Sequence, residues 1–434
     1  MVDHARLDRE FVWHPFTQQQ GWSEEEPLMI ERGEGSYLFD TEGRRYLDGT
    51  AALWCNVHGH RHPVIDAAVR EQLDRVAHTT MLGLSHPGAT ELAARLVAIA
   101  PEGLSRVFYS DSGSTAAEIA LKIAFQYQQQ RGGEHARRTK FLRLREAYHG
   151  DTIGSVSIGG IDLFHSTYRP LLFETHVAEP GDAADLERVL AAHGDEVAAV
   201  VVEPLVQGAA GILVQPPGYL RAARELCDRF GALLVCDEVA TGFGRTGTMF
   251  ACEQEGVAPD LMCLAKGITG GYLPLAATLT SEEIYAGFLG SYEEFKTFFH
   301  GHTYTGNPLA CAAALANLDV FEQERTLERL GPKIALLEEL LAEVAVMPEV
   351  AEVRQKGVMV GIDLGDHEAA LRMGHRVTVE ARKRGAFIRP LGNTVVLMPP
   401  LSIREDELRE LVAIARDSIR AAVASAPIDL PQAA

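Results

Sequence analysis

Six short apolar runs, separated by segments with helical periodicity, lie between residues 61 and 325 and constrain the fold more than any other feature. A strand that is covered on both faces reads as a continuous apolar run, and parallel strands need crossover connections that are usually helical. The alternation predicts an α/β domain with a mostly parallel central sheet and helices on both faces. The runs are RVFYS (106–110), KFLRLR (140–145), AAVVVEP (198–204), ALLVCDE (232–238), LMCLA (261–265) and LAATLT (275–280).

The two ends of the chain have a different character. Residues 1–60 contain GSYLFDTEGRRYLDG, which predicts a hairpin around Glu42 and Gly43. Residues 326–434 alternate amphipathic helical patterns with a second expected hairpin that turns at Gly392 and Asn393. We expect a large domain over 61–325 and a small α+β domain over 326–434, joined by the N-terminal segment 1–60.

Composition excludes several classes of partner. The net charge is −20, which disfavours nucleic acid and anionic membrane surfaces because both attract clustered Lys and Arg. No apolar run approaches the roughly 18 residues of a membrane-spanning helix. The polar start MVDHARLDRE does not resemble a signal peptide, and the six cysteines include no C-x-x-C pair. We therefore expect a cytoplasmic protein with reduced core cysteines.

Polar or charged residues end four of the apolar runs: Ser110, Glu203, Asp237 and Lys266. Ligands of open α/β sheets bind beyond the carboxyl ends of the strands, where these side chains would converge. Each residue alone could be an ordinary solvated loop residue. Four of them at one edge of the sheet predict a binding site.

The turn SDSGSTAAE, between the first run and the next helix, is a candidate phosphate site. Gly113 permits a tight turn, and Ser114 or Thr115 could cap the helix. Free backbone N–H groups at a helix N-terminus bind anions, although an ordinary strand-to-helix turn would have the same sequence pattern.

Lys266 and Asp237 complete a recognisable set of groups. A lysine in a dry pocket has a lowered pKa and can form a Schiff base, and a buried carboxylate needs a cationic partner such as a protonated ring nitrogen. Lys266 follows Asp237 by 29 residues, which allows one helical crossover between neighbouring strands. A phosphate cradle, an acid and a Schiff-base lysine together predict pyridoxal 5′-phosphate as cofactor.

The chain resembles the class III (ω-type) aminotransferases among the fold-type I pyridoxal-phosphate enzymes, nearly from end to end. The segments that carry the resemblance are SDSGSTAAEIALK, YHGDT (148–152), VVEPLVQGAAG, CDEVATGFGRTG, LAKGITGGYLPLA and HGHTYTGNPLACAAA (300–314). The resemblance implies a homodimer that converts small-molecule substrates at a site on the subunit interface.

The resemblance also implies a role for each cofactor-binding residue. Lys266 would bond covalently to the cofactor, and Asp237 would pair with its ring nitrogen. Tyr148 and Val239 would pack on opposite faces of the ring, and Glu203 would orient the surroundings of Asp237. The phosphate would be held by Gly113 and Ser114 of one subunit and by Thr303, beside Gly301 and His302, of the other.

Three further segments resemble the class III members that aminate 8-amino-7-oxononanoate to 7,8-diaminononanoate in biotin synthesis: WHPFTQ (13–18), DGTAALWCNVHGHRHP (48–63) and RPLGNTVVLMPP (389–400). The amino donor would be S-adenosyl-L-methionine or, as FFHGHTYTGNPLA suggests, L-lysine. Arg389 would bind the substrate carboxylate by a two-pronged hydrogen bond. The implied substrate-binding residues are Phe16, Leu53, Trp54, Tyr148, Lys266, Gly301 and Arg389.

Several alternatives stay open at this point. The chain could be another ω-aminotransferase acting on β-alanine, putrescine or 4-aminobutyrate, an aminomutase or decarboxylase with the same cofactor, or a non-catalytic cofactor-binding protein. His58, His60 and His62 could suggest a metal site, but no carboxylate or cysteine ligand set accompanies them, so we expect no metal there.

Overall fold

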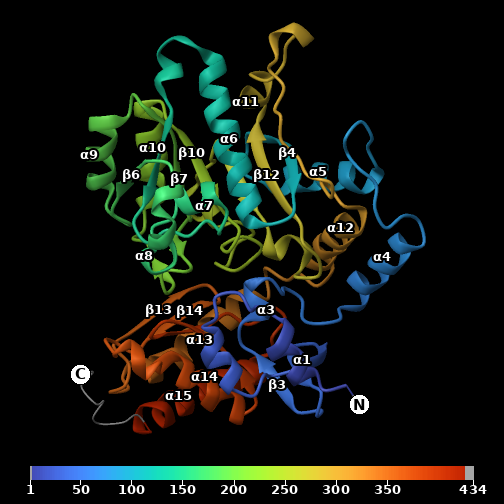
Figure 1. The fold of residues 1–434 in the computed structure, drawn as a ribbon, viewed down its shortest axis with the longest axis vertical. Helices are drawn as coiled ribbons and strands as arrows, with labels where there is room; N and C mark the ends of the chain where they lie inside the picture. The colour runs from blue at the N-terminus through green and yellow to red at the C-terminus, as the bar shows by residue number, and fades with distance from the viewer. Residues whose placement is uncertain (1, 426–434) are drawn as a thin grey trace.

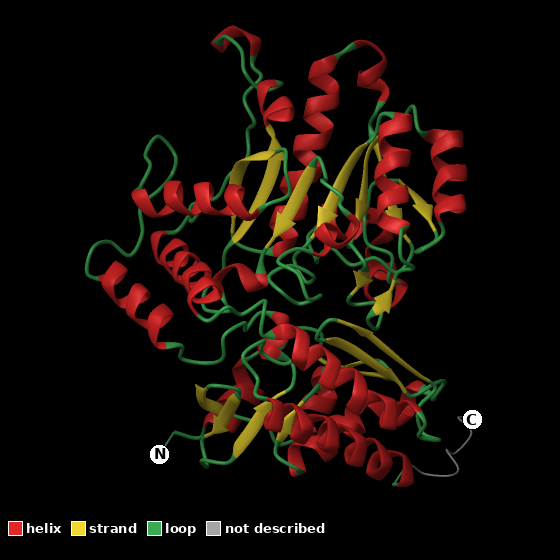
Figure 2. Ribbon diagram, turned by 180° about the vertical axis from the view of Figure 1, so that it is seen from behind, coloured by secondary structure: helices red, strands yellow, loops and turns green. Residues whose placement is uncertain are grey.

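The computed structural model describes residues 2–425. A larger α/β part occupies the upper half of Figure 1, and a smaller part below it is built from both ends of the chain. The blue N-terminal and red C-terminal segments lie side by side in the smaller part, as Figure 2 also shows from behind. The division of the chain into an N-terminal segment (1–60), a large domain (61–325) and a small domain (326–434) stays a prediction.

The larger part is organised by a seven-stranded sheet with the strand order β4-β12-β11-β10-β7-β5-β6. Neighbours from β11 to β6 pair in parallel, whereas β12 pairs antiparallel with both β11 and β4. The expected α/β fold with a mostly parallel sheet is confirmed. The strands are β4 (Leu104–Ser110), β5 (Lys140–Leu144), β6 (Thr175–Ala178), β7 (Val197–Val202), β10 (Leu233–Asp237), β11 (Leu261–Leu264) and β12 (Ala276–Ser281).

Both faces of this sheet are covered. In β10, Leu233 and Val235 pack into the cluster that contains the apolar face of α6, whereas Leu234 and Cys236 pack into the cluster on the opposite face. Figure 1 shows α6 in front of the sheet, and Figure 2 shows the helices behind it. The covering helices are α6 (Gly113–Arg131) and α11 (Glu282–Ala286) on one face and α5 (Pro87–Ile99), α9 (Ala183–His193), α10 (Tyr219–Phe230) and α12 (Pro308–Gln323) on the other.

Two details differ from expectation. The edge strand β6 was not predicted, because Thr175–Ala178 is too short and too polar to form an apolar run. The connection between β10 and β11 contains a short 3₁₀ helix, η3 (Ala251–Glu255), where an α-helix was expected. The two strands are nevertheless parallel neighbours, as the spacing of Asp237 and Lys266 predicted.

The smaller part joins the two ends of the chain through a four-stranded sheet of order β1-β2-β3-β15. In this sheet Ala386 pairs with Leu47, about 340 residues earlier in the chain. Both predicted hairpins are confirmed, β2–β3 and β16–β17. The elements are β1 (Ile30–Glu34), β2 (Tyr37–Asp40), β3 (Arg45–Asp48), β13 (Glu352–Lys356), β14 (Met359–Asp363), β15 (Ala386–Phe387), β16 (Arg389–Leu391), β17 (Thr394–Leu397), α13 (Leu330–Ala345), α14 (Met373–Lys383) and α15 (Glu405–Ala424).

The remaining elements are short or lie in connections. Over the described part of the chain, no helix is long and apolar enough to cross a membrane. These elements are α1 (His4–Phe11), α2 (Gln19–Glu24), α3 (Ala51–Trp54), α4 (Pro63–Leu73), α7 (Ile153–Ser157), α8 (Asp162–His165), β8 (Val206–Gln207), β9 (Leu213–Val214), η1 (Gly133–Arg137), η2 (Ser166–Leu171), η4 (Lys266–Thr269), η5 (Tyr292–Glu294) and η6 (Ala369–Leu371).

Candidate active site

A cavity of about 410 Å³ lies at the carboxyl edge of the parallel strands. Because β7, β10 and β11 are adjacent and parallel, the residues that follow them meet there. The predicted site residues that line it are Trp54, Gly113, Ser114, Tyr148, Glu203, Asp237, Val239 and Lys266.

Lys266 follows β11 and begins η4 in a left-handed backbone conformation, with φ of +47°. A non-glycine residue held there is strained by about 1–3 kcal/mol, and such strain clusters at functional sites. Burial lowers the pKa of Lys266, and the nearby charge of Asp237 only partly opposes this effect. The amine nitrogen lies 4.9 Å from the ring centroid of Trp54. Lys266 is therefore biased toward the uncharged, nucleophilic amine.

Asp237 ends β10 on the floor of the cavity. One carboxylate oxygen lies 2.7 Å from Nδ1 of the buried His149, and the other accepts a hydrogen bond of 3.0 Å from the backbone N–H of Val239. Burial disfavours the charged form of His149, but its hydrogen bond to Asp237 and the neighbouring carboxylates outweigh burial and raise the pKa of His149. The pair fixes a carboxylate in position to meet a cationic ring nitrogen.

The N-terminus of α6 also faces the cavity. Ser112 caps this helix, with Thr115 as its reciprocal partner, so the cap lies two or three residues before the expected Ser114 or Thr115. A Cβ on Gly113 would stand 2.7 Å from Cγ1 of Val239, which explains why a glycine begins the helix. The first turn of α6 is thus open to an anion.

Tyr148 and Glu203 form one unit. The backbone N–H of Tyr148 donates to Glu203 Oε1 at 3.0 Å, and the N–H of Gly208 donates to Oε2 at 2.8 Å. Glu203 therefore fixes the backbone of Tyr148, next to His149, and His149 contacts Asp237 directly. Burial raises the pKa of Glu203 to about 7. The hydroxyl of Tyr148 donates to Asp151 at 2.7 Å.

These groups fit pyridoxal 5′-phosphate. The start of α6, with Gly113 and Ser114, would hold the phosphate; Asp237 would hold the ring nitrogen; and Lys266 would hold the carbonyl carbon. The cavity also presents Tyr148 and Val239 as packing surfaces for a flat ring. A site with an anion-binding end, an acidic floor and an amine matches the chemistry of that cofactor.

Six of the predicted site residues do not line this cavity of their own chain. Phe16 and Arg389 line a second cavity of about 490 Å³ between the N-terminal segment and the small part. Phe16 is connected to the first cavity through Phe164, whose ring lies 5.3 Å from Phe16 and 6.4 Å from Tyr148. The side chain of Leu53 is half exposed. Gly301, His302 and Thr303 lie on a connection that precedes α12 and do not line the cavity of their own chain.

Two features of the site were not predicted. His149 stands within the YHGDT segment, but nothing in the sequence signalled that it would contact Asp237, 88 residues away. The second is the backbone of residues 51–54, which has positive φ at four successive positions, +47°, +50°, +69° and +71°. This left-handed turn leads into Trp54, whose side chain is buried and lines the cavity.

Comparison with known proteins agrees with this geometry. The family model "Aminotransferase class-III" matches residues 19–419, so the chain belongs to the class III aminotransferases. These are pyridoxal-phosphate enzymes of fold-type I. Curated relatives named adenosylmethionine-8-amino-7-oxononanoate aminotransferase include the protein of Nitratidesulfovibrio vulgaris, 60% identical over 95% of this chain and 81% of its own length. That of Aquifex aeolicus is 52% identical over 94% and 95%.

Solved structures give the same result. The enzyme with that name from Methanocaldococcus jannaschii superposes with a TM-score of 0.94 at 43% identity, covering 96% of this chain and 98% of its own. An (S)-enantioselective ω-transaminase from Thermomicrobium roseum superposes with a TM-score of 0.92 at 34% identity, covering 97% and 98%. The fold is therefore shared by proteins that are named for different activities.

Proposed function

We propose that this chain transfers an amino group to 8-amino-7-oxononanoate, forming 7,8-diaminononanoate for biotin synthesis, with pyridoxal 5′-phosphate as cofactor. The observation that carries the proposal is the cavity in which Lys266, the Asp237–His149 pair and the open start of α6 face one another. The curated relatives at 43–60% identity support the choice of acceptor.

The chain's residues divide the chemistry among them. The bound cofactor supplies an electron-withdrawing ring that stabilises negative charge on the substrate carbon. Asp237 keeps the ring nitrogen protonated, and His149 fixes the carboxylate. Lys266 Nζ would accept the proton that leaves the amino donor's carbon and pass it on within the first half of the cycle, and would deliver a proton to the acceptor's carbon in the second half. The donor leaves as its oxo product before the acceptor is aminated, so the kinetics should be ping-pong.

Arg389 and Phe16 provide the proposed acceptor end. A guanidinium binds a carboxylate through two parallel hydrogen bonds, and Arg389 lines the second cavity beside Phe16. The aromatic contact from Phe16 through Phe164 to Tyr148 joins the two cavities. A long acceptor with its oxo group at one end and its carboxylate at the other suits this arrangement.

The amino donor is S-adenosyl-L-methionine or L-lysine. Leu53 is half exposed, whereas its neighbour Trp54 is buried and lines the cavity. The test supplies purified enzyme with 8-amino-7-oxononanoate and each donor separately and measures 7,8-diaminononanoate. Product from one of these donors supports the proposal; none from either would refute it.

A second candidate is another ω-aminotransferase activity, on β-alanine, putrescine or 4-aminobutyrate. The ω-transaminase of Thermomicrobium roseum, with its TM-score of 0.92, keeps this candidate open. Turnover of these amines that greatly exceeds turnover of 8-amino-7-oxononanoate would favour it.

We also propose a cytoplasmic homodimer with the active site at the subunit interface. Gly301, His302 and Thr303 lie away from the cavity of their own chain, where they could reach the phosphate of a second copy. The cysteines are free thiols, five of them buried, which suits a reducing compartment. A monomeric mass of 47.3 kDa in light scattering of the active enzyme would refute the dimer.

A further inference from the structure

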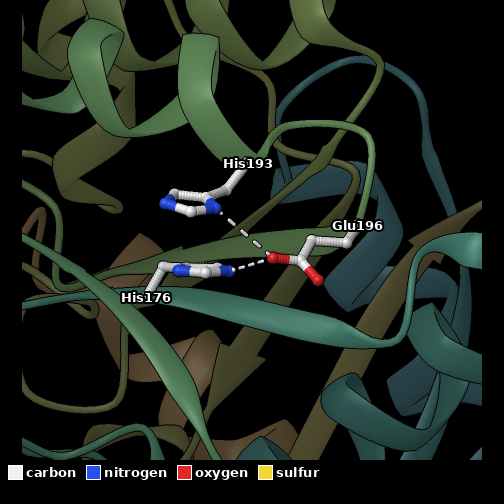
Figure 3. A group of neighbouring side chains, drawn as sticks. All are labelled: His176, His193 and Glu196. Carbon is white, nitrogen blue, oxygen red and sulfur yellow. Dashed lines mark hydrogen bonds and ion pairs between the residues drawn. The ribbon is translucent and has the colours of Figure 1, made fainter.

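Two imidazole rings and a carboxylate meet on the surface of the large part, away from both cavities. Nε2 of His176 lies 2.8 Å from Oε1 of Glu196, and Nδ1 of His193 lies 3.4 Å from the same oxygen. The two rings are stacked, with centroids 4.2 Å apart (Figure 3). All three ligand atoms lie within 4.8 Å of one another.

We propose that His176, His193 and Glu196 form a binding site for Zn²⁺ that is separate from the catalytic centre. Two imidazoles and one carboxylate are ligands that Zn²⁺ commonly takes, with water in the fourth position. Zinc bonds of about 2.0–2.2 Å place two ligands of a tetrahedral site roughly 3.3–3.6 Å apart. Of the separations from Glu196 Oε1, that to His193, 3.4 Å, lies within this range, and that to His176, 2.8 Å, must lengthen slightly.

The three side chains stand on well-fixed backbone. His176 lies in β6, paired with Leu142 of β5, and His193 is the last residue of α9. The backbone N–H of Glu196 donates to the carbonyl of His193 at 3.0 Å, and its carbonyl accepts from Lys140 at 2.9 Å. Ligands on a strand, a helix end and an anchored turn need only side-chain rotation to bind a cation.

Charge and access also suit a cation. The side chains of His193 and Glu196 are 47% and 32% exposed, which leaves room for an ion and its water. The net charge of −20 favours cations in general.

One neighbour opposes binding. Nζ of Lys140 lies 3.5 Å from Oε2 of Glu196 and 3.6 Å from Glu174. Lys140 thus pairs with Oε2 of Glu196, which faces away from the imidazoles, and leaves Oε1 free to bind the metal. The positive charge of Lys140 nevertheless repels a dication. Removing that charge should therefore strengthen the site, whereas removing either imidazole should weaken it.

The experiment titrates metal-stripped enzyme, with its cofactor bound, with Zn²⁺ against a chromophoric chelator, and uses Co²⁺ absorbance to report imidazole coordination. We expect one equivalent to bind, with at least tenfold weaker affinity in His176→Gln and His193→Gln and tighter affinity in Lys140→Gln. His4→Gln, in α1 at the opposite end of the molecule, is the matched control and should bind as the wild type does (Figure 1).

A second measurement guards against a folding defect. Zn²⁺ should raise the Tm of the wild type and of His4→Gln, and should leave the Tm of the two cluster variants unchanged while their transamination rates stay normal. Absence of saturable binding in the wild type, or binding to both histidine variants as tight as to the wild type, would overturn the proposal and leave a hydrogen-bonded cluster without a metal.

Discussion

Replacing Gly113 with alanine tests whether the close contact between α6 and Val239 shapes the cofactor site. The new Cβ would stand 2.7 Å from Cγ1 of Val239, about 1 Å inside the optimal carbon–carbon separation of ~3.5–4.0 Å. Val239 must move to relieve the overlap. Because the N–H of Val239 donates to Asp237 Oδ1, this movement also disturbs the acid expected to hold the ring nitrogen.

The size of the effect follows from overpacking. An added methyl group in a packed site costs about 1–3 kcal/mol. If that cost falls on the cofactor-bound state, the dissociation constant rises roughly 5- to 150-fold. The assay removes the cofactor, titrates pyridoxal 5′-phosphate back and follows the absorbance of the bound form in wild type and Gly113→Ala.

Two further variants decide the interpretation. Val239→Ala combined with Gly113→Ala removes the overlapping methyl groups and should recover part of the lost affinity. Gly331→Ala, in α13, is the matched control, because no atom lies within 4 Å of its added Cβ. Unchanged affinity in Gly113→Ala, or no recovery in the double variant, would refute the steric argument.

Four other changes probe the remaining site residues. Lys266→Ala should abolish turnover and the absorbance of covalently bound cofactor; a variant that keeps either would contradict the proposed mechanism. Asp237→Asn should slow transamination about 100-fold or more, because a neutral amide cannot hold a ring nitrogen protonated, and single-turnover kinetics measures this directly. Arg389→Ala should raise the acceptor KM roughly 10- to 150-fold by loss of a charged hydrogen bond of ~1.5–3 kcal/mol, and an unchanged KM would place Arg389 elsewhere. Burial raises the pKa of Glu203 to about 7, so between about pH 4.5 and 7 the folded state binds more protons than the unfolded state. Glu203 therefore reduces the free energy of unfolding as pH rises through that window. Tm measured against pH should show this loss in the wild type and not in Glu203→Gln.

The sheet and the meeting of Glu203, Asp237 and Lys266 in one cavity were predictable because each rests on a local pattern. Continuous apolar runs marked the buried strands, and the residues after them had to meet at the carboxyl edge of a parallel sheet. The edge strand β6 was not predicted because a strand at the edge of a sheet needs no continuous apolar run. Only Ala178 of its four residues is buried.

Contacts between distant residues could not be predicted in the same way. Glu203 lines the same cavity as Asp237, but the sequence did not indicate that its oxygens accept from the backbone N–H groups of Tyr148 and Gly208, or that His149 contacts Asp237. Every residue except proline carries a backbone N–H, so the sequence does not indicate which of these groups a buried carboxylate will bind. The second cavity likewise depends on how the N-terminal segment docks beside β16, which no local pattern specifies.

The position of β12 in the sheet has a consequence for synthesis of the protein. Among the strands of residues 2–425, β4 pairs only with β12, so the strand that leads into α6 has no hydrogen-bonded neighbour from this set until residues 276–281 have been made. A chain leaving the ribosome at ~5–20 residues per second must therefore wait roughly 10–30 s between translating these two strands. During that interval the turn at the start of α6 lacks the support that β12 gives to β4, and we expect a nascent chain to acquire its cofactor only after β12 has emerged.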